Sequence, residues 1–331
     1  MKPRYRRSAY RRTPSFGFFL PSAVLARLLG SLHVSWTTSF ASKVIDLVLS
    51  IASTIGVAVV LRMARQYDRN IEIVIAANYV IAAAIGLLLA LATDKLASVE
   101  PLTAVLGFIG GLIWPTAFHL YASGIATFGL ARTGAWARLS LAVPVLLGLV
   151  FFGEALTPRL ATGLALLFGA FLLLTPRLAP VSELRPPDRR APKVLLYAGT
   201  LIITFGVIDA WVSLFNEVAS GEDDLAFFVV LFGTAAAVST TMALKRGNSF
   251  TRVDSLTGVA LGILNFSVSY FLLRALAGGF EGRSALAFTL FSASSLVLMA
   301  LIGRLAWGEQ VKGREVAGIA TAMVAIIALN L

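Results

Sequence analysis

Apolar runs of about 20 residues recur along most of this chain, separated by short polar segments. An α-helix of that length crosses the hydrocarbon core of a bilayer, which is about 30 Å thick. Backbone groups in lipid must be paired within their own segment, so each run is expected to be helical. The pattern predicts an all-α integral membrane protein with ten transmembrane helices, at residues 44–61, 71–93, 102–125, 128–152, 158–176, 194–216, 223–244, 255–276, 284–306 and 312–331.

Residues 1–43 do not follow this pattern. Lys and Arg crowd the start, and the moderately apolar stretch 16–38 is interrupted by Pro21, Arg27 and His33. Basic residues before an apolar stretch imitate a signal peptide, but this stretch is too interrupted for one. Three interpretations stay open: a disordered basic tail with an interfacial helix, an eleventh weak span, or a start codon placed too early, with Val44 as the true first residue.

The segment 177–193 differs from the other loops because it is long, charged and rich in proline. Such a composition is typical of a linker between compact parts. It divides the predicted spans into two five-helix halves, 44–176 and 194–331.

A short motif, Gly-Glu-x4-Arg-x3-Gly, occurs once in each half, 155 positions apart. Its positions are Gly153, Glu154, Arg159 and Gly163 in the first half, and Gly308, Glu309, Arg314 and Gly318 in the second. Further matches at the same spacing include Ser140 with Ser295 and Gly107 with Gly262. The second half is therefore expected to be a copy of the first. Because each copy has an odd number of spans, the copies are expected to form inverted repeats, with a substrate site near the midplane between them.

The composition supports a membrane protein. The chain has 331 residues, of which 58% are hydrophobic and 14% are charged, whereas soluble domains carry about 25% charged residues. The net charge of +11 is better explained by basic cytoplasmic loops than by nucleic-acid binding. Cysteine is absent and only His33 and His119 are present, so thiolate chemistry, disulfides and His-rich metal sites are excluded, and no metal or cofactor is expected.

The doubled Gly-Glu motif, placed after the fourth span of each five-helix half, resembles the EamA-type proteins of the drug/metabolite transporter superfamily. The resemblance covers residues 44–331. It implies a secondary transporter that moves small metabolites, often outward, without ATP. The absence of a Walker-type phosphate-binding loop from the sequence agrees with this.

The charges of the loops predict an orientation. One alternating set of loops holds most of the Lys and Arg residues, and the other set holds only Lys95, Arg159 and Arg283. Positive charges favour the cytoplasmic side, so the linker 177–193 is expected in the cytoplasm and both ends of the bundle outside. This differs from the orientation that the resemblance implies, in which both ends of the chain are cytoplasmic.

The two motif glutamates, Glu154 and Glu309, invite a role in proton coupling. Each lies at a span boundary, five residues before Arg159 or Arg314. A structural role is favoured, either as a cap on the next helix or as a bridge between helices.

The candidates for a substrate or coupling site are polar and aromatic side chains inside the spans. They are Asp209, His119, Arg138, Arg274, Asn265, Trp114, Trp136, Trp211 and Tyr270. An Asp at a helix centre costs about 2.5–3.5 kcal/mol and is expected to face a cavity or a partner. Asp209 is therefore the preferred coupling group or partner for a substrate amine. The cavity is expected to be lined from the third, fourth, sixth, eighth and ninth spans.

Several candidates also have structural interpretations. Arg138 and Arg274 have side chains long enough to reach the headgroup layer. His119 and Asn265 can bond to neighbouring helices instead. At the 155-residue spacing His119 matches Arg274, which would place the two on equivalent faces.

Two further features concern the shape of the cavity. Trp114 precedes Pro115, which either breaks the third span toward a cavity or makes a packing kink. Thr54 stands at the position that the repeat assigns to the counterpart of Asp209, so the acid is not duplicated.

Three functions are compared. A transporter is preferred over a non-transporting scaffold or channel subunit. It is also preferred over an intramembrane enzyme, because no motif pairs a serine with His119. The expected partners are a small-molecule substrate and membrane lipid, with no nucleic acid, in a monomer or homodimer. The expected location is the cytoplasmic (inner) membrane of the cell, with several spans.

Overall fold

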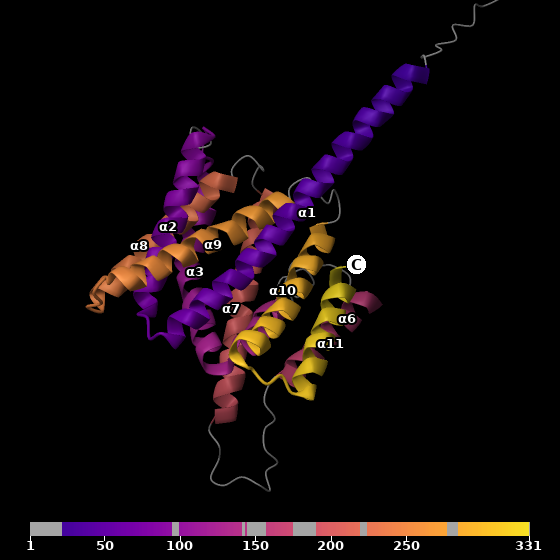
Figure 1. Cartoon of the computed structure of the whole chain (residues 1–331). Coiled ribbons are helices and arrows are strands. Elements are labelled where there is room, and N and C mark those ends of the chain that lie inside the picture. Colours follow the sequence, from indigo (N-terminus) through magenta and orange to yellow (C-terminus); the bar gives the residue numbers. More distant parts are fainter. Residues whose placement is uncertain are drawn as a thin grey trace, which may run out of the picture. The chain divides into compact units, whose positions relative to one another are not determined.

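The computed structural model describes residues 22–94, 99–140, 143, 157–174, 190–218, 224–276 and 284–330. All regular structure in these ranges is helical, without strands. The helices (Figure 1) are α1 (Ser22–Gln66), α2 (Ile71–Ala92), α3 (Pro101–Phe128), α4 (Leu130–Leu139), α6 (Pro158–Leu174), α7 (Arg190–Val218), α8 (Asp224–Lys245), α9 (Arg252–Leu276), α10 (Ser284–Trp307) and α11 (Gly313–Asn330). The predicted all-α class is confirmed for the described residues, and each of the ten apolar runs overlaps one of these helices.

The chain separates into two units, Met1–Ser42 and Lys43–Leu331. In the first unit the described part is helical and forms the beginning of α1, so this helix starts before Val44. The interpretations of residues 1–21 lie outside the described residues. All contacts described below belong to the second unit.

Seven helical segments among the described residues are long and apolar enough to cross a membrane. They are Val44–Gln66, Ile71–Ala92, Pro101–Phe128, Lys193–Val212, Asp224–Lys245, Arg252–Ala275 and Leu290–Trp307. Ala161–Leu174 in α6 is apolar but shorter, and α4 is described only to Leu139. The predicted span 128–152 therefore continues into residues outside the described part, which also include Gly153, Glu154 and linker positions 177–189.

Helix α3 crosses α8 at two glycines. A Cβ added to Gly107 would lie 2.9 Å from the Cβ of Val230. On Gly111 it would lie 2.5 Å from both the carbonyl oxygen of Leu231 and the Cβ of Thr234. The two helices approach closely here because glycine has no side chain, as is common between membrane helices.

Helix α9 crosses α2 in the same manner. A Cβ on Gly258 would lie 2.6 Å from the carbonyl oxygen of Val74. A Cβ on Gly262 would lie 2.5 Å from the carbonyl oxygen of Asn78. The α9–α2 crossing thus uses two glycines four residues apart, as the α3–α8 crossing does.

These two crossings correct one match made on the sequence. Gly258 follows Gly107, and Gly262 follows Gly111, by 151 positions rather than 155. The equivalent of Gly107 in the packing is therefore Gly258, and the match of Gly107 with Gly262 is wrong by four residues. Four residues are about one helical turn. Such a shift keeps the glycine on the same face of the helix, so apolar periodicity in the sequence does not reveal it.

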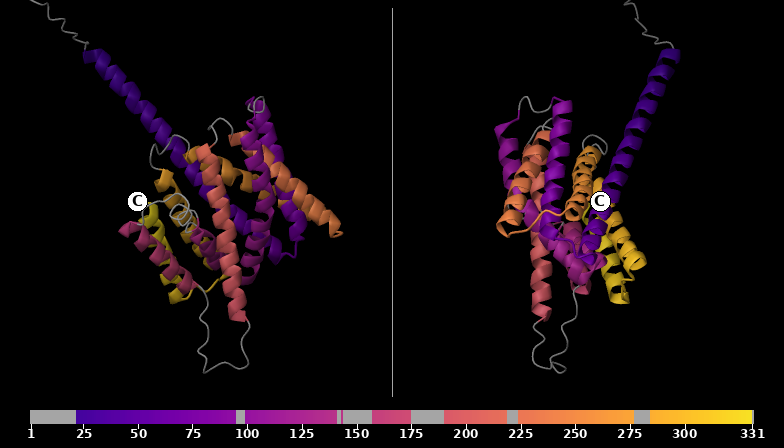
Figure 2. Two further views of the ribbon diagram at one scale, coloured as in Figure 1. Left: turned by 180° about the vertical axis from the view of Figure 1, so that it is seen from behind. Right: turned by 60° about the vertical axis from the view of Figure 1, so that its left-hand side comes forward.

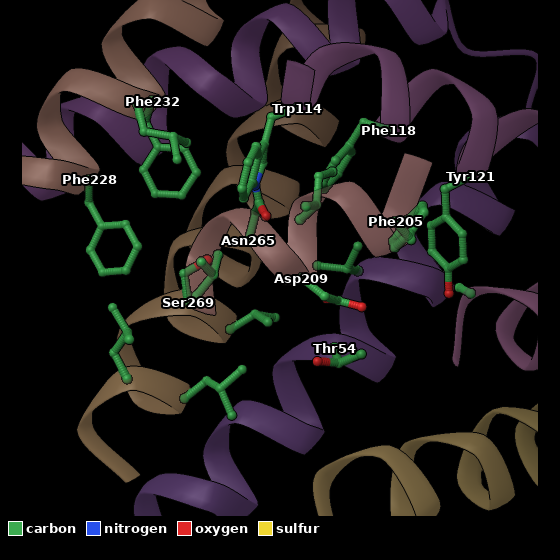
Figure 3. Close-up of a pocket in the computed structure, with 18 of the residues that line it drawn as sticks. Thr54, Trp114, Phe118, Tyr121, Phe205, Asp209, Phe228, Phe232, Asn265 and Ser269 are labelled. Atoms are coloured by element: carbon green, nitrogen blue, oxygen red, sulfur yellow. The ribbon is translucent and has the colours of Figure 1, made fainter. Parts of the chain in front are cut away.

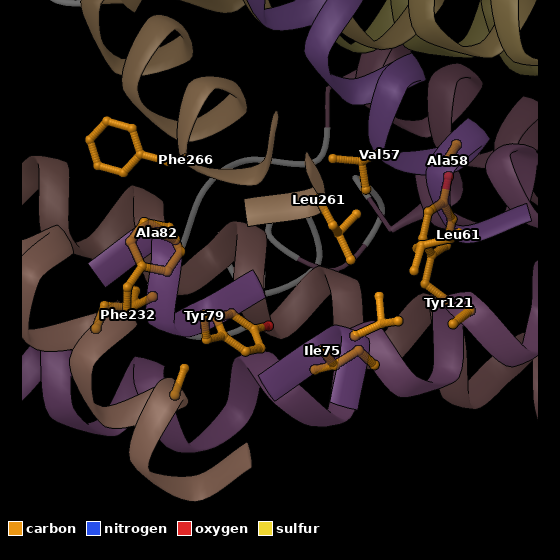
Figure 4. Close-up of a cluster of buried hydrophobic side chains, with 14 of the residues drawn as sticks. Val57, Ala58, Leu61, Ile75, Tyr79, Ala82, Tyr121, Phe232, Leu261 and Phe266 are labelled. Carbon is orange, nitrogen blue, oxygen red and sulfur yellow. The ribbon is translucent and has the colours of Figure 1, made fainter. Parts of the chain in front are cut away.

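Two clusters of buried side chains stabilise the second unit. The larger joins α1, α2, α3, α8 and α9 around Leu61, Tyr79, Phe232 and Leu261 (Figure 4). The smaller includes Trp136 of α4 together with residues of α6, α7, α10 and α11. Helices α6 and α11 lie side by side (Figure 1, and Figure 2, left).

Polar contacts gather several helix connections at one end of this unit. The side-chain amide of Asn70, before α2, donates to Asn248, before α9, at 2.7 Å. Arg246 pairs with Glu72 beside them. The indole of Trp307 at the end of α10 donates to the side chain of Gln66 at the end of α1, at 2.8 Å. We call the end formed by the α1–α2, α3–α4, α8–α9 and α10–α11 connections the Glu309 end.

Candidate functional site

A cavity of about 200 Å³ lies inside the unit and is lined from α1, α3, α4, α7, α8, α9 and α10. It includes the five spans expected to line it, and also α1 and α8. Most of the wall is apolar and much of it aromatic, as Figure 3 shows for Trp114, Phe118, Phe228 and Phe232. The polar residues in the wall are Thr54, Tyr121, Arg138, Asp209, Asn265 and Ser269.

Asp209 of α7 lies in this wall (Figure 3). Its Oδ2 is 2.6 Å from the hydroxyl oxygen of Ser140, and that hydroxyl is also 2.7 Å from the carbonyl oxygen of Ala137. Ser140 is 1% exposed. A hydroxyl has one proton to donate, so the ionised Asp209 competes with Ala137 for it. A protonated Asp209 would instead donate to Ser140 while Ser140 donates to Ala137.

Arg138 of α4 also faces the cavity rather than a distant headgroup layer. The Cζ atom of its guanidinium lies 4.6 Å from the centre of the Phe291 ring, within the range of a cation–π contact. Its Nε is buried and finds no hydrogen-bond partner among the described residues. Its charge interacts with that of Asp209. The cavity therefore contains one cationic and one acidic side chain.

Asn265 of α9 and Trp114 of α3 complete the predicted residues that reach the cavity. Asn265 is 6% exposed, and its amide nitrogen has no hydrogen-bond partner in the described part of the chain. Trp114 precedes Pro115, yet α3 continues through this proline to Phe128. Of the two alternatives for Pro115, a break of the third span was wrong: the helix ends at Phe128, and Gly129 after it has a left-handed φ of 86°.

Five of the predicted residues lie away from the cavity wall, and three of them are Trp136, Trp211 and Tyr270. Trp136 is fully buried in the smaller cluster, and the Trp211 indole donates to the carbonyl of Leu106 at 2.9 Å. The ring of Tyr270 stacks on Phe266.

Arg274 and His119 are also outside the wall. Arg274 pairs with Asp46 of α1, with 3.3 Å between Nε and Oδ2, and its guanidinium is 3.4 Å from the hydroxyl of Tyr270. His119 is half-buried on α3 and does not line the cavity. At the 151-position spacing of the glycine crossings, the counterpart of His119 is Tyr270 rather than Arg274.

Three residues that line the cavity or contact a predicted site residue were not predicted from the sequence. Asp46, the partner of Arg274, lies outside the cavity wall near the start of the first apolar run, where an acid is unremarkable, yet it is 4% exposed. Ser140 was noted only as a repeat match and Thr54 only as the counterpart of Asp209. The repeat itself carried the signal for Thr54, because both it and Asp209 line the cavity.

The motif glutamate Glu309 lies in a different place. Its carboxylate accepts the backbone N–H groups of Leu130 at 2.8 Å and of Ala131 at 3.1 Å. These are the first two residues of α4, so Glu309 caps the N-terminus of a helix in the other half. Capping of the next helix, α11, was the wrong alternative, and a bridge between helices is what the structure contains.

The surroundings of Glu309 leave room for its carboxylate and hold it. A Cβ on Gly129 or on Gly303 would lie within 2.7 Å of an oxygen of Glu309. Arg62 of α1 lies 4.0 Å from the same carboxylate and donates to the carbonyl of Ile125 at 2.7 Å.

The motif arginines make reciprocal contacts. Arg159 at the start of α6 donates to the carbonyl of Ala328 near the end of α11, at 3.0 Å. Arg314 at the start of α11 donates to the carbonyl of Leu172 near the end of α6. Gly318 of α11 lies against Leu174 of α6, with 2.9 Å between its would-be Cβ and the Leu174 side chain. Gly163 is buried, and Gly308 has a left-handed φ of 63°.

No family model matches the chain. The chain is similar to an uncharacterized protein of Haemophilus influenzae (strain ATCC 51907 / DSM 11121 / KW20 / Rd), with 28% identity over 298 residues, which cover 86% of this chain and 97% of that protein. It is also similar in fold to a protein of known crystal structure, with a TM-score of 0.55 and 20% identity, over 87% of this chain and 96% of the other.

Proposed function

We propose that the chain is an integral membrane protein, a secondary transporter that moves a small metabolite by alternating access and is coupled to a proton gradient or to exchange. The observation that carries the proposal is the cavity, because it is lined from both halves and contains Asp209 and Arg138. This agrees with the resemblance of the doubled Gly-Glu motif to EamA-type transporters.

The side chains on the outside of the helices support a membrane location. Leu88 is 67% exposed, Leu196 72% and Leu305 74%. Each lies on one of the seven long apolar segments. Large apolar side chains exposed along several helices favour a lipid environment over water.

The packing supports inverted repeats. The pairing of α3 with α8 and that of α9 with α2 are the same contact made twice if α2 and α3 correspond to α8 and α9. The reciprocal contacts of Arg159 and Arg314 add a second such pair. A two-fold axis in the membrane plane, between the halves, would relate both pairs.

The same geometry suggests which end is closed. The wall of the cavity includes Phe227 near the start of α8, Leu273 near the end of α9 and Phe291 near the start of α10. All three lie toward the end opposite the Glu309 end. At the Glu309 end, the bonds of Glu309 to α4 and of Trp307 to Gln66 tie the halves together. A substrate can then pass through the Glu309 end only when these hydrogen bonds break.

Asp209 is the proposed coupling residue. Its bond to Ser140 is compatible with both protonation states, because Ser140 has a backbone acceptor in Ala137 to which its hydroxyl turns when Asp209 is protonated. An acid whose neighbour serves both states can take up and release a proton without leaving a buried polar group unpaired.

The test is transport by the purified chain in proteoliposomes, with gradient-driven uptake and exchange measured separately. We expect Asp209→Asn to lose gradient-driven uptake and to keep exchange. A variant with both activities intact would remove Asp209 from the mechanism. A wild-type chain that moves no substrate in either assay, over a broad panel of amino acids, organic acids, amines, sugars and nucleosides, would favour a scaffold or channel subunit instead.

We further propose that the Glu309 end is cytoplasmic. The basic residues Arg62, Arg246 and Lys312 lie there, in agreement with the preference of positive charge for the cytoplasmic side. The cysteine-free chain allows a direct test with an impermeant maleimide on intact cells. Thr93→Cys at the opposite end should be labelled and Ser249→Cys at the Glu309 end should not. The reverse result would invert the orientation.

A further inference from the structure

Two residues of the cavity wall each carry a buried hydrogen-bond donor that has no partner in the described part of the chain. These donors are the amide nitrogen of Asn265 on α9 and the Nε of Arg138 on α4. A buried donor without an acceptor is costly. Such groups in a pocket wall fix the orientation of a ligand that supplies the missing acceptors.

The carboxylate already in the wall does not meet this need, because neither donor has Asp209 as a hydrogen-bond partner. Asp209 instead has Ser140 as a partner at 2.6 Å, and Ser140 is held to α4 by its contact with Ala137. Among the buried polar atoms of these wall residues, the two without a partner in the described part of the chain are both donors, and one of them belongs to a cation. A ligand amine would supply more donors, whereas a ligand carboxylate would supply acceptors.

The rest of the wall indicates the chemical nature of the part of the ligand that carries no charge. Aromatic rings from α3 and α8, including Trp114, Phe228 and Phe232, form much of it (Figure 3). A small apolar group, and a flat ring in particular, is stabilised by such surroundings. The cavity volume of about 200 Å³ limits the ligand to a small molecule.

We infer that the cavity binds a small molecule with a carboxylate group and an apolar, ring-sized body. Arg138 binds the carboxylate, Asn265 donates to a ligand oxygen, and the aromatic wall surrounds the body. This assignment rests on the proposed function in that the bound molecule is the one transported. It differs from the sequence-based expectation that the recognised group is an amine bound to Asp209.

The first test compares three probes that share a body and differ in charge: 3-phenylpropionate, phenethylamine and 3-phenylpropanol. Each is added at the same concentration to the detergent-purified full chain, and the melting temperature is measured. A ligand of the folded state raises it. We expect 3-phenylpropionate to raise it most and phenethylamine to leave it unchanged. Stabilisation by phenethylamine, or none by 3-phenylpropionate, would overturn the inference.

Two variants make the test specific to the wall. Asn265→Leu removes the unpaired donor and should weaken binding of 3-phenylpropionate by about tenfold. Ser267→Ala, on the same helix, is the matched control, because Ser267 bonds to the carbonyl of Ile263 and does not line the cavity. It should bind as the unmodified chain does. Equal affinities in all three proteins would contradict the role of Asn265.

A third variant distinguishes a carboxylate ligand from an amine ligand by whether it strengthens or weakens binding. Asp209→Asn removes a negative charge from the cavity and keeps the size of the side chain. Binding of 3-phenylpropionate should become tighter, because the repulsion between two carboxylates is lost. If the ligand were an amine bound to Asp209, this variant would lose the binding instead. Weaker binding of 3-phenylpropionate to Asp209→Asn would overturn the assignment.

Transport assays keep this inference distinct from the proposed function. If 3-phenylpropionate binds but no carboxylate of this class is moved in proteoliposomes, the ligand class holds and the transport proposal fails. If the chain transports an amine or a sugar and does not bind the acid, transport holds and the ligand class fails.

Discussion

Glu309 and Asp209 are both partly or wholly enclosed carboxylates, and their surroundings differ in kind. Glu309 accepts two backbone N–H groups at the start of α4, and these donors cannot turn away. Asp209 faces a hydroxyl, Ser140, that has a second acceptor within 2.7 Å. Fixed donors suit a carboxylate that stays ionised and holds two helices together. A hydroxyl that can turn suits a carboxylate that changes its protonation state.

The difference also follows the repeat. Glu309 belongs to a motif present in both halves, and Arg159 and Arg314 of that motif make the same contact from opposite directions. Asp209 has Thr54 at its equivalent position, and both line the cavity. In this chain the duplicated residues Arg159 and Arg314 join the halves, whereas a residue that departs from the duplication gives the cavity its acidic group.

The largest effect on stability is expected from substitutions at the two glycine crossings, α3 with α8 and α9 with α2. Gly111→Ala would push a Cβ to 2.5 Å from the backbone of α8. Overpacking of this kind should lower the free energy of unfolding by about 2–3 kcal/mol. Gly262→Ala, at the matching crossing, should have a similar effect.

The control for this prediction is Gly233→Ala on α8, where nothing lies within 4 Å of the added Cβ. It should be neutral or stabilise by up to about 1 kcal/mol, because glycine disfavours the helix. Thermal unfolding in detergent measures all three variants. Equal stability of Gly111→Ala and Gly233→Ala would contradict the close crossing.

Removal of the Glu309 cap is expected to have the next largest effect. Glu309→Ala leaves the N–H groups of Leu130 and Ala131 without an acceptor, which should cost about 1–2 kcal/mol of stability. Glu309→Gln keeps one acceptor oxygen and should lose about half as much. A melting curve of Glu309→Ala equal to that of the unmodified chain would show that the bond between Glu309 and α4 does not stabilise the fold.

The smallest effect is expected at Ser140. Ser140→Ala removes the hydroxyl beside Asp209, and Ser295→Ala removes its repeat equivalent, which donates to the carbonyl of Phe291 at 2.6 Å. Both should change stability by about 1 kcal/mol or less. Only Ser140→Ala should slow gradient-driven uptake, by a few-fold, and exchange should not change. A similar loss of uptake in both variants would show that the acid is not the cause.

The helices and part of the cavity wall were predicted from the sequence. Apolar runs determine helices directly, so each predicted span overlaps a described helix. Asp209, Arg138, Asn265 and Trp114 reach the cavity as predicted. The spacing of a motif says nothing of which helix its side chain meets. The partner of Glu309 is α4, about 180 positions earlier in the chain.

Other errors have the same physical origin. A one-turn change in register preserves the apolar face of a helix, so the pairing of Gly107 was misassigned. Long polar side chains such as Arg274 find partners in three dimensions, here Asp46, that no local pattern reveals. Aromatic residues in spans, such as Trp136, fill cores as readily as they line cavities.

The central claim is that Asp209 serves coupling and Glu309 serves structure. The most direct measurement compares Asp209→Asn and Glu309→Ala in the same two assays, thermal unfolding in detergent and gradient-driven uptake against exchange in proteoliposomes. Asp209→Asn should unfold at nearly the temperature of the unmodified chain, lose gradient-driven uptake and keep exchange. Glu309→Ala should unfold at a lower temperature, and the protein that remains folded should keep the normal ratio of uptake to exchange. The opposite pattern, with coupling lost in Glu309→Ala and retained in Asp209→Asn, would contradict the account.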